Sequence, residues 1–582
     1  MPPEESKQTD PELDKAAAQE VIEEAETGQD GSADSHDDVS QSQNTPQAEA
    51  TAGASAQKKK SKKKKIKKAL GMGANTQAEA STSSSEPSSK DASLLRGKVA
   101  NHLLSNNPSL QREVAGMPED KVQEMLQKLN VSDLLTGMAV GGKNQKDMAS
   151  YKFWQTQPVP RFDEPVENED GPITVIDPEK VPKEAAKLIE GFEWVTMDLT
   201  EETQLQELYE LLNGHYVEDD EAMFRFNYSV PFLNWALKAT GWRKEWHVGV
   251  RAVQSRKLVA FISGVPVALR VRSKTLRCSE INFLCIHKKL RSKRLAPVLI
   301  KEITRRCYAV DVWQAIYTGG VVLPTPVSSC RYFHRSLDWL KLYEVGFSPL
   351  PQTSTKVRQI TKYHLPNNTS TNGLRPMQLK DVDAVLALLQ KYLERFDMAP
   401  IFTREEVEHW LLNKDGAEVG QVVHSYVVEA SHSSLEYFGG YAHERLQEPE
   451  THRITDFFSF YGLDSSVIGK KKHDVVRAAY LFYYASEAAF QESTGDITAL
   501  KTRLNALIND ALILAKGLTY DVFNALTLLD NPLFLEKQKF GAGDGQLHYY
   551  LYNYRTAPIM GGVDAKNQVD ERHGSGVGVV ML

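Results

Sequence analysis

An internal repeat limits the folds open to this chain. Four kinds of segment recur in the same order about 180 residues apart. Each half has a Met-x-Leu sequence before a helical pattern, an amphipathic segment with a Trp, a strand-like run ending in Ser, and an apolar run leading into a helix. The pairs are Met197–Glu201 with Met377–Asp381, Phe232–Trp235 with Val407–Trp410, Phe261–Ser263 with Phe457–Ser459, and Ile281–Ile286 with Ala479–Tyr484. We expect two copies of one α/β unit.

The first quarter of the chain has a different composition. No Phe, Trp or Tyr precedes Tyr151, residues 1–57 are acidic, and Lys58–Lys68 is almost entirely lysine. Such a segment buries too little apolar surface to offset the entropy of ordering. We expect 1–148 to be a mostly disordered arm, with a short helix over Asp120–Leu135. The lysines suit unspecific contact with the ribosome or an anionic surface, or simply a solvated tail.

Localisation and redox state follow from what the sequence lacks. It has no signal peptide and no apolar run long enough to span a membrane, so a cytoplasmic protein without a transmembrane segment is expected. The four cysteines include no Cys-x-x-Cys pair (Cys278, Cys285, Cys307 and Cys330). They are expected to be reduced packing thiols, without zinc or disulfides.

The segment Glu280–Ile300 carries the strongest chemical pattern. An apolar strand is followed by five cations within seven residues (Lys288, Lys289, Arg291, Lys293 and Arg294), and then by one helical face (Leu295, Val298, Leu299, Ile303 and Cys307). A strand, a basic loop and a helix start form a phosphate-binding arrangement, because the first helical N–H groups are free. A solvated basic turn is the alternative. CoA acetyltransferases have Arg/Gln-x-x-Gly-x-Gly/Ala here, whereas this chain has Arg294 at the first Gly.

A second glycine-rich segment, Lys539–Gly545, lacks the Gly-Lys-Ser/Thr ending of a P-loop. Its spacing predicts a tight turn before the aromatic strand His548–Tyr552. No serine elbow, metal-binding His pair or Cys/His dyad stands out, so an enzyme of this sequence would work without a side-chain nucleophile.

The last residues, Gly574–Leu582, are uncharged and increasingly apolar. Burial of this tail would bring the terminal carboxylate into an apolar pocket, raise its pKa and make it usable as a base. A final strand that closes a core, with the carboxylate just outside, is the alternative.

Two motifs identify a family. Glu280–Lys288 and Lys539–Gly545 resemble the signature motifs of eukaryotic glycylpeptide N-tetradecanoyltransferase, or N-myristoyltransferase, and the resemblance extends over 149–582. Further similar segments are Tyr151–Pro160, Val217–Phe226 and Tyr317–Pro324.

The resemblance implies a fold and a reaction. The fold is α/β, a duplicated acetyltransferase-like (GNAT-type) fold in which two pseudo-symmetric halves share a mixed sheet. Residues 149–365 would bind acyl-CoA, and 366–582 would bind peptide and supply the C-terminal carboxylate. Myristate would pass from myristoyl-CoA to the α-amine of N-terminal-glycine protein substrates by direct attack on the thioester, in a monomer without metal or permanently bound cofactor.

Site residues follow by the same resemblance. The backbone of Phe283 and Leu284 would form the oxyanion hole, and the carboxylate of Leu582 would be the base. Cofactor contacts would come from Tyr151, Lys152, Phe153, Trp154, Leu284, Cys285, Ile286, Ser292, Lys293, Arg294, Leu295 and Ala296. Peptide contacts would come from Tyr216, Asp219, Phe224, Phe226, Tyr228, Asn282, Thr318, Tyr332, His334 and Asp544.

Two other classes fit parts of the sequence. A small-acyl acetyltransferase would keep the fold but need only a short acyl pocket. An RNA- or ribosome-binding adaptor would depend on Lys58–Lys68 alone.

Overall fold

The computed structural model describes residues 151–582 except 163, 165–169, 219–222, 292, 413–419, 431–452, 470–471, 491–496 and 565. The expected arm, the helix over Asp120–Leu135 and the run Lys58–Lys68 lie outside the described residues. No helix in the described part is both long and apolar enough to cross a membrane.

One mixed sheet of thirteen strands runs through the described part of the chain. Its main path is β1-β3-β4-β5-β6-β16-β7-β15-β14-β11-β10-β8, and β9 (Met398–Pro400) pairs with β4 beside it. The first-copy strands are β1 (Phe192–Thr196), β3 (His247–Ala252), β4 (Leu258–Val271), β5 (Lys274–Ile286) and β6 (Gln314–Gly319). The second-copy strands are β8 (Leu374–Pro376), β10 (Val423–Glu429), β11 (Ile454–Gly462), β14 (Ala478–Ser486) and β15 (Val522–Leu526).

The two copies have the same topology, which confirms the predicted duplication. In each, four strands pair antiparallel and a fifth pairs parallel with the fourth. The helices recur in the same order: α6 (Glu202–His215), α7 (Val230–Leu237) and α8 (Leu295–Tyr308), then α11 (Val382–Leu393), α12 (Arg404–Leu411) and α14 (Thr498–Gly517). Even a local detail recurs. Ser263 Oγ donates to Asn282 O (2.9 Å) and Ser459 Oγ donates to Tyr483 O (2.7 Å), both next to a register shift.

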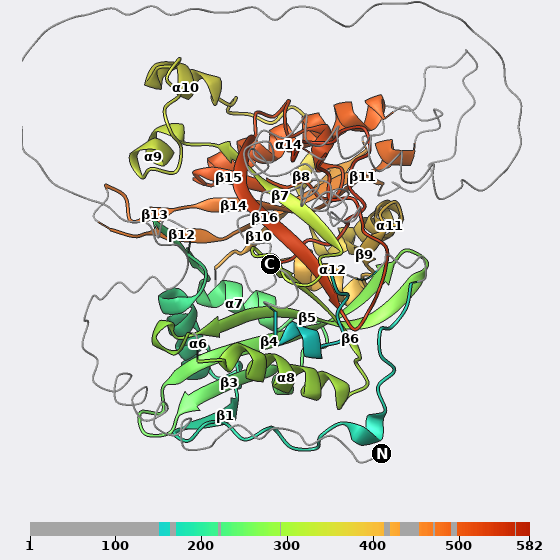
Figure 1. The fold of residues 1–582 in the computed structure, drawn as a ribbon. Helices are drawn as coiled ribbons and strands as arrows, with labels where there is room; N and C mark the ends of the chain where they lie inside the picture. The colour runs from blue at the N-terminus through green and yellow to red at the C-terminus, as the bar shows by residue number, and fades with distance from the viewer. Residues whose placement is uncertain are drawn as a thin grey trace, which may run out of the picture. The chain divides into compact units, whose positions relative to one another are not determined.

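The copies exchange strands where they meet. β7 (Ser328–Ser336) follows β6 in the chain but pairs with β15 of the second copy. β16 (Gly541–Tyr552) follows β15 but pairs with β6 of the first copy. The exchanged strands also pair with each other, at the centre of the sheet in Figure 1. Each copy is therefore completed by a strand from the other.

Local sequence explains the main helices. Thr403 and Glu406 form a capping box at the start of α12, so two otherwise unpaired N–H groups are satisfied. Leu295, Leu299, Ile303 and Cys307 recur at four-residue spacing on α8 and are buried against the sheet.

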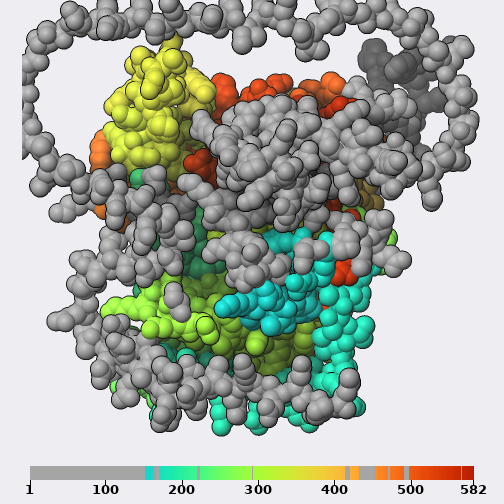
Figure 2. All heavy atoms as spheres, viewed as in Figure 1, coloured from blue at the N-terminus to red at the C-terminus, as the bar shows by residue number. Residues whose placement is uncertain are grey.

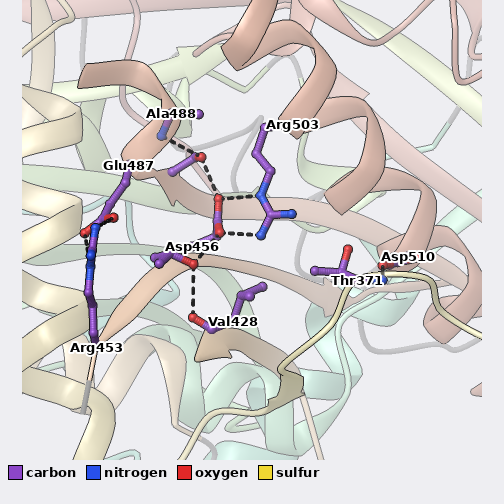
Figure 3. Close-up of polar contacts among 10 residues, drawn as sticks. Thr371, Val428, Arg453, Asp456, Glu487, Ala488, Arg503 and Asp510 are labelled. Atoms are coloured by element: carbon purple, nitrogen blue, oxygen red, sulfur yellow. Dashed lines mark hydrogen bonds and ion pairs between the residues drawn. The ribbon is translucent and has the colours of Figure 1, made fainter. Parts of the chain in front are cut away.

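A buried charge joins α14 to the sheet of the second copy. Asp456 on β11 is 2% exposed and accepts hydrogen bonds from Arg503 Nε (3.0 Å) and from the Ser486 hydroxyl (2.6 Å). Figure 3 shows Arg503 reaching from its helix to this carboxylate, with Asp510 holding the backbone of Thr371 nearby. A buried charge needs such partners, so these contacts fix the helix against the sheet.

Smaller elements surround the sheet. A second sheet joins β2 (Phe224–Asn227) of the first half to β12 (Asp464–Val467) and β13 (Val475–Val476) of the second. The chain between the copies carries α9 (Trp339–Glu344) and α10 (Lys356–Lys362), and short 3-10 turns include η2 (Trp154–Thr156), η3 (Pro178–Lys180), η4 (Lys244–Trp246), η5 (Lys288–Leu290), η6 (Leu379–Asp381), η8 (Glu487–Phe490) and η9 (Asn531–Leu533).

Candidate functional site

A mostly apolar cavity lies between β5, β6 and α8. Its volume is about 190 Å³, more than ten times the ~10–15 Å³ that one water requires, so it can hold a ligand much larger than a water molecule. Lining residues include Trp154, Tyr216, Ile281, Asn282, Phe283, Leu284, Ile300, Ile303, Thr304, Cys307, Tyr308, Tyr317, Thr318, Tyr552 and Leu582.

The wall formed by β5 contains a bulge at Phe283. The pairing with β4 shifts register between Phe261 and Ser263, and Phe283 adopts the left-handed region, with φ 56°. β6 pairs with β5 only as far as Ile281. The Phe283 N–H points toward the hydroxyl of Tyr216, a second lining residue. The bulge thus takes the Phe283 N–H out of the ladder and toward a residue of the cavity wall.

The C-terminal tail reaches the same cavity. Val579, Val580 and Met581 are buried, and Leu582 lines the cavity. Tyr549 Oη donates to Val579 O (2.9 Å), and Val580 N–H donates to Tyr483 Oη (3.0 Å). The predicted burial of the tail is confirmed. Its residues form no regular strand, only isolated bridges between Ser575 and Gly561 and between Val577 and Met398.

The basic segment forms a loop before α8, as predicted. Arg294 is the N-cap residue in a left-handed conformation (φ 61°, ψ 24°), without a side-chain cap. In the described part of the chain no carboxylate pairs with Lys293 or Arg294, and both are exposed. Lys288 instead donates to Glu218 (2.6 Å), and Arg291 donates to the backbone carbonyl of His215. Two cations and a helix N-terminus are therefore open to an anion; Ser292 lies outside the described residues.

The segment that begins the described chain covers one side of the cavity. Trp154 stacks on Tyr317 (5.7 Å between ring centroids, 6° between planes), and the Tyr151 hydroxyl donates to Val322 O (2.9 Å). Phe153 packs edge-on against Trp154, and Lys152 is exposed. Figure 2 shows this segment in cyan at the surface, against the green first half.

Several predicted peptide contacts are gathered in one aromatic group. The Tyr228 ring packs against Tyr216, Phe226 and Phe283 with centroids 5.2–5.9 Å apart, and Asn282 and Thr318 line the cavity. Phe224 lies apart from it, edge-on to Phe347. Asp219 lies outside the described residues.

A second group lies on β7 and β16. Tyr332 and His334 are stacked, and His334 Nδ1 is 2.7 Å from Asn524 Oδ1. Burial lowers the pKa of His334. A Cβ on Gly543 would lie 2.4 Å from His334 Nε2, so any side chain there would displace the His334 ring, and Asp544 next to it is exposed.

The prediction of a tight turn at Lys539–Gly545 is wrong. Gly541 already belongs to β16, and the register with β7 shifts between Ala542 and Gln546. Residues 543–545 thus oppose the single residue Tyr332. The glycines accommodate an irregular bulge of three residues within a strand, not a turn before one.

The cysteines are free and buried. Burial raises the pKa of Cys285 to about 12, and its thiol lies 3.9 Å from Leu211 O, so it is not a ready nucleophile. The described residues include no group of three His, Cys, Asp or Glu that could hold a metal ion. A Cβ on Gly319 would make only ordinary contacts, the nearest at 3.5 Å from Val321 O.

Some lining residues were not predicted. Ile300, Thr304 and Tyr308 continue the cavity along α8, and Glu280 lies beside it, bonded to Asn282. The helical spacing of the α8 residues was visible in the sequence, but spacing does not distinguish a face that packs from a face that lines a cavity.

Comparison with known proteins gives consistent matches. Residues 172–330 match the family model described as the N-terminal domain of myristoyl-CoA:protein N-myristoyltransferase, and 344–580 match that of its C-terminal domain. A glycylpeptide N-tetradecanoyltransferase of Aspergillus fumigatus is 66% identical over 485 residues, covering 83% of this chain and 94% of the relative. The Schizosaccharomyces pombe protein of the same name is 50% identical, covering 82% of this chain and 99% of its own length. A crystal structure of Saccharomyces cerevisiae N-myristoyltransferase with bound myristoyl-CoA is similar with a TM-score of 0.68 and 49% identity, covering 74% of this chain and 99% of that one.

Proposed function

The chain belongs to the myristoyl-CoA:protein N-myristoyltransferase family, and we propose from this premise that it transfers myristate from myristoyl-CoA to the α-amine of an N-terminal glycine. One observation carries the mechanism. A single cavity is lined by the bulge residues Phe283 and Leu284, by Asn282 and Thr318, and by the C-terminal residue Leu582.

The oxyanion hole consists of the backbone N–H groups of Phe283 and Leu284. When the amine attacks the thioester, negative charge develops on the carbonyl oxygen, and donors already aimed at that oxygen stabilise it. The left-handed φ of Phe283 supports this role because it turns the backbone out of the ladder.

The terminal carboxylate of Leu582 is the base. An α-amine has a solution pKa of about 8, so it arrives mainly as ammonium and must lose a proton before it attacks. The buried tail supports this assignment, because Tyr549 and Tyr483 hold the backbone of Val579 and Val580 and thereby fix where the carboxylate lies. The positioned amine attacks directly, so no acyl-enzyme forms.

Acyl-CoA binds mainly through residues 149–365. The start of α8, with Lys293 and Arg294, holds the phosphates, and Trp154 and the apolar face of α8 surround the acyl chain. Residues 366–582 contribute Asp544 to the peptide groove and supply the terminal carboxylate, while the other candidate peptide contacts lie in residues 149–365. An N-terminal glycine is required because a Cβ would crowd the amine beside Asn282 and Thr318.

Transfer of labelled myristate to a Gly-initiated peptide, with an Ala-initiated peptide as control, tests the activity. Absence of transfer by the wild-type chain would refute the proposal. Competition among palmitoyl-, myristoyl- and acetyl-CoA then distinguishes a long-chain enzyme from a small-acyl transferase.

Changes at Leu582 test the base. Deleting Leu582 withdraws the carboxylate, and appending residues replaces it with an amide. Both should lower kcat by roughly 10²–10⁴, the usual share of general-base catalysis, with acyl-CoA affinity unchanged. Leu582→Ala keeps the carboxylate and should be milder. In single-turnover transfer, higher pH should partly rescue the deletion. An extended chain with wild-type kcat would exclude this base.

Three further expectations stay predictions: a cytoplasmic location, a monomeric state, and contact of Lys58–Lys68 with the ribosome or an anionic surface. Removal of residues 1–100 should reduce turnover less than about tenfold, which would exclude the adaptor function.

A further inference from the structure

Glu280 is a carboxylate next to the reaction site to which the proposed mechanism gives no role. It precedes Asn282 by two residues on β5, so both side chains lie on the same face of the strand. Asn282 Nδ2 donates to Glu280 Oε1 at 2.7 Å. Asn282 in turn lines the cavity that Leu582 and Thr318 line.

The surroundings of Glu280 are apolar or neutral. Two tyrosines of other strands, Tyr461 on β11 and Tyr483 on β14, lie near enough for the charge of Glu280 to act on them. Burial raises the pKa of both phenols, so both are neutral near pH 7. Among the described residues no cation pairs with Glu280. Burial accordingly raises the pKa of Glu280 to about 7, and the hydrogen bond from Asn282 limits the rise. The other carboxylate at the site is that of Leu582.

An ionised carboxylate accepts hydrogen bonds and donates none. Paired with ionised Glu280, the Asn282 amide must keep Nδ2 on that side, which leaves Oδ1 available to the cavity. A protonated Glu280 could donate to Oδ1 instead and reverse the amide. The two orientations differ for a substrate amine, because Oδ1 accepts a hydrogen bond from an ammonium and Nδ2 does not.

We propose that Glu280 is a positioning residue that orients the Asn282 amide, so that Asn282 Oδ1 accepts a hydrogen bond from the α-ammonium of the incoming glycine. This inference rests on the proposed function and adds to it a determinant of amine recognition. Glu280 acts through Asn282 and does not itself touch the substrate. Its effect should be confined to peptides with a free N-terminus and should fade as the pH falls through about 7.

Glu280→Gln tests the inference, since glutamine keeps the size but never ionises. With myristoyl-CoA saturating, Glu280→Gln should raise the peptide KM at pH 8 by about tenfold, the scale of a lost charge-assisted hydrogen bond, with kcat changed less. The ratio of kcat/KM in the wild type to kcat/KM in Glu280→Gln should fall toward one as the pH drops below about 7. This fall is the acid limb that ionisation of Glu280 adds to the wild-type profile. An N-acetylated glycyl peptide, which has no ammonium, should inhibit both proteins equally within twofold.

A second background checks that the effect passes through Asn282. In Asn282→Ala, adding Glu280→Gln should change KM less than twofold. The inference would be overturned if Glu280→Gln kept the wild-type peptide KM and acid limb. It would also be overturned if Glu280→Gln weakened binding of the acetylated peptide as much as that of the free peptide, or raised KM as much in the Asn282→Ala background as in the wild type. If Glu280→Gln does not fold, Glu280→Asp, which retains an ionisable group, must keep the acid limb. Wild-type transfer and myristoyl-CoA affinity by calorimetry are measured alongside, so failure of the proposed function is recognised separately.

Discussion

Arg294 allows the contribution of a side chain to acyl-CoA binding to be separated from that of the backbone. Its guanidinium is exposed at the start of α8, without a carboxylate partner in the described part of the chain, and its backbone is left-handed with φ 61°. Arg294→Ala removes the guanidinium but keeps a Cβ in this conformation. Arg294→Gly also removes the guanidinium but relieves the conformation.

Both variants should weaken myristoyl-CoA binding equally, by about 1.5–3 kcal/mol for a hydrogen bond to a charged group, or roughly 10–150-fold in Kd. Their folding stabilities should differ, with the Gly variant more stable than the Ala variant by up to ~1 kcal/mol. Calorimetric titration gives the Kd, and urea unfolding gives the stability. The weakening should diminish at high salt.

Arg256 is the matched control. It has the same left-handed φ of 60°, and its exposed side chain lies in the turn between β3 and β4, outside the residues that line the cavity. Arg256→Ala and Arg256→Gly should reproduce the stability difference with unchanged acyl-CoA affinity. If Arg294→Gly restored the affinity that Arg294→Ala lost, the backbone and not the guanidinium would be responsible. Unchanged affinity in both would mean that the phosphates do not bind here.

Two other predictions follow from packing and from burial. Gly543→Ala places a Cβ against His334 Nε2. Displacing that ring should cost about 1–3 kcal/mol and weaken peptide binding, while the affinity for acyl-CoA stays normal. Normal peptide binding would show that His334 is not part of the peptide groove. Burial also lowers the pKa of His247, His424 and His548 to about 4, below the unfolded value of 6.5. The unfolded state therefore binds more protons than the folded state between these values, and stability falls as the pH drops from 6.5 toward 4. Each of these histidines should lower the free energy of unfolding by on the order of 2 kcal/mol between pH 7 and pH 5. Equal free energies of unfolding at the two pH values, measured with urea, would contradict this.

The duplicated fold was predictable because each copy carries its own hydrophobic pattern. The Phe-x-Ser runs at Phe261 and Phe457 occupy equivalent strands, β4 and β11, and the apolar runs occupy β5 and β14. The strand exchange was not predictable, because the pattern of β7 shows that it is a strand but not which strand it pairs with.

The candidate site was predictable in part, for a similar reason. Contiguous motifs located the basic loop before α8 and the strand that precedes it, but not the bulge at Phe283, while the apolar tail indicated burial of the segment that ends at Leu582. Distances between remote segments decide the remainder. The glycines around Gly543 fit a turn equally well until the pairing of β16 with β7 is known. The position of Glu280 near Tyr461 and Tyr483 depends on strands some 180 to 200 residues away in the sequence.

The exchange of β7 and β16 has a consequence for synthesis of the chain. Gly319 on β6 has its strand partner, His548 on β16, 229 residues later in the chain, so this edge of β6 is unpaired until that residue is synthesised. At the ~5–20 residues per second of translation, that edge stays open for roughly 10–50 s. An open strand edge pairs readily with other chains, so the nascent first copy is exposed to non-native pairing at this edge for that time. The two copies are alike in topology, yet cutting the chain between them would leave each without the strand that closes it.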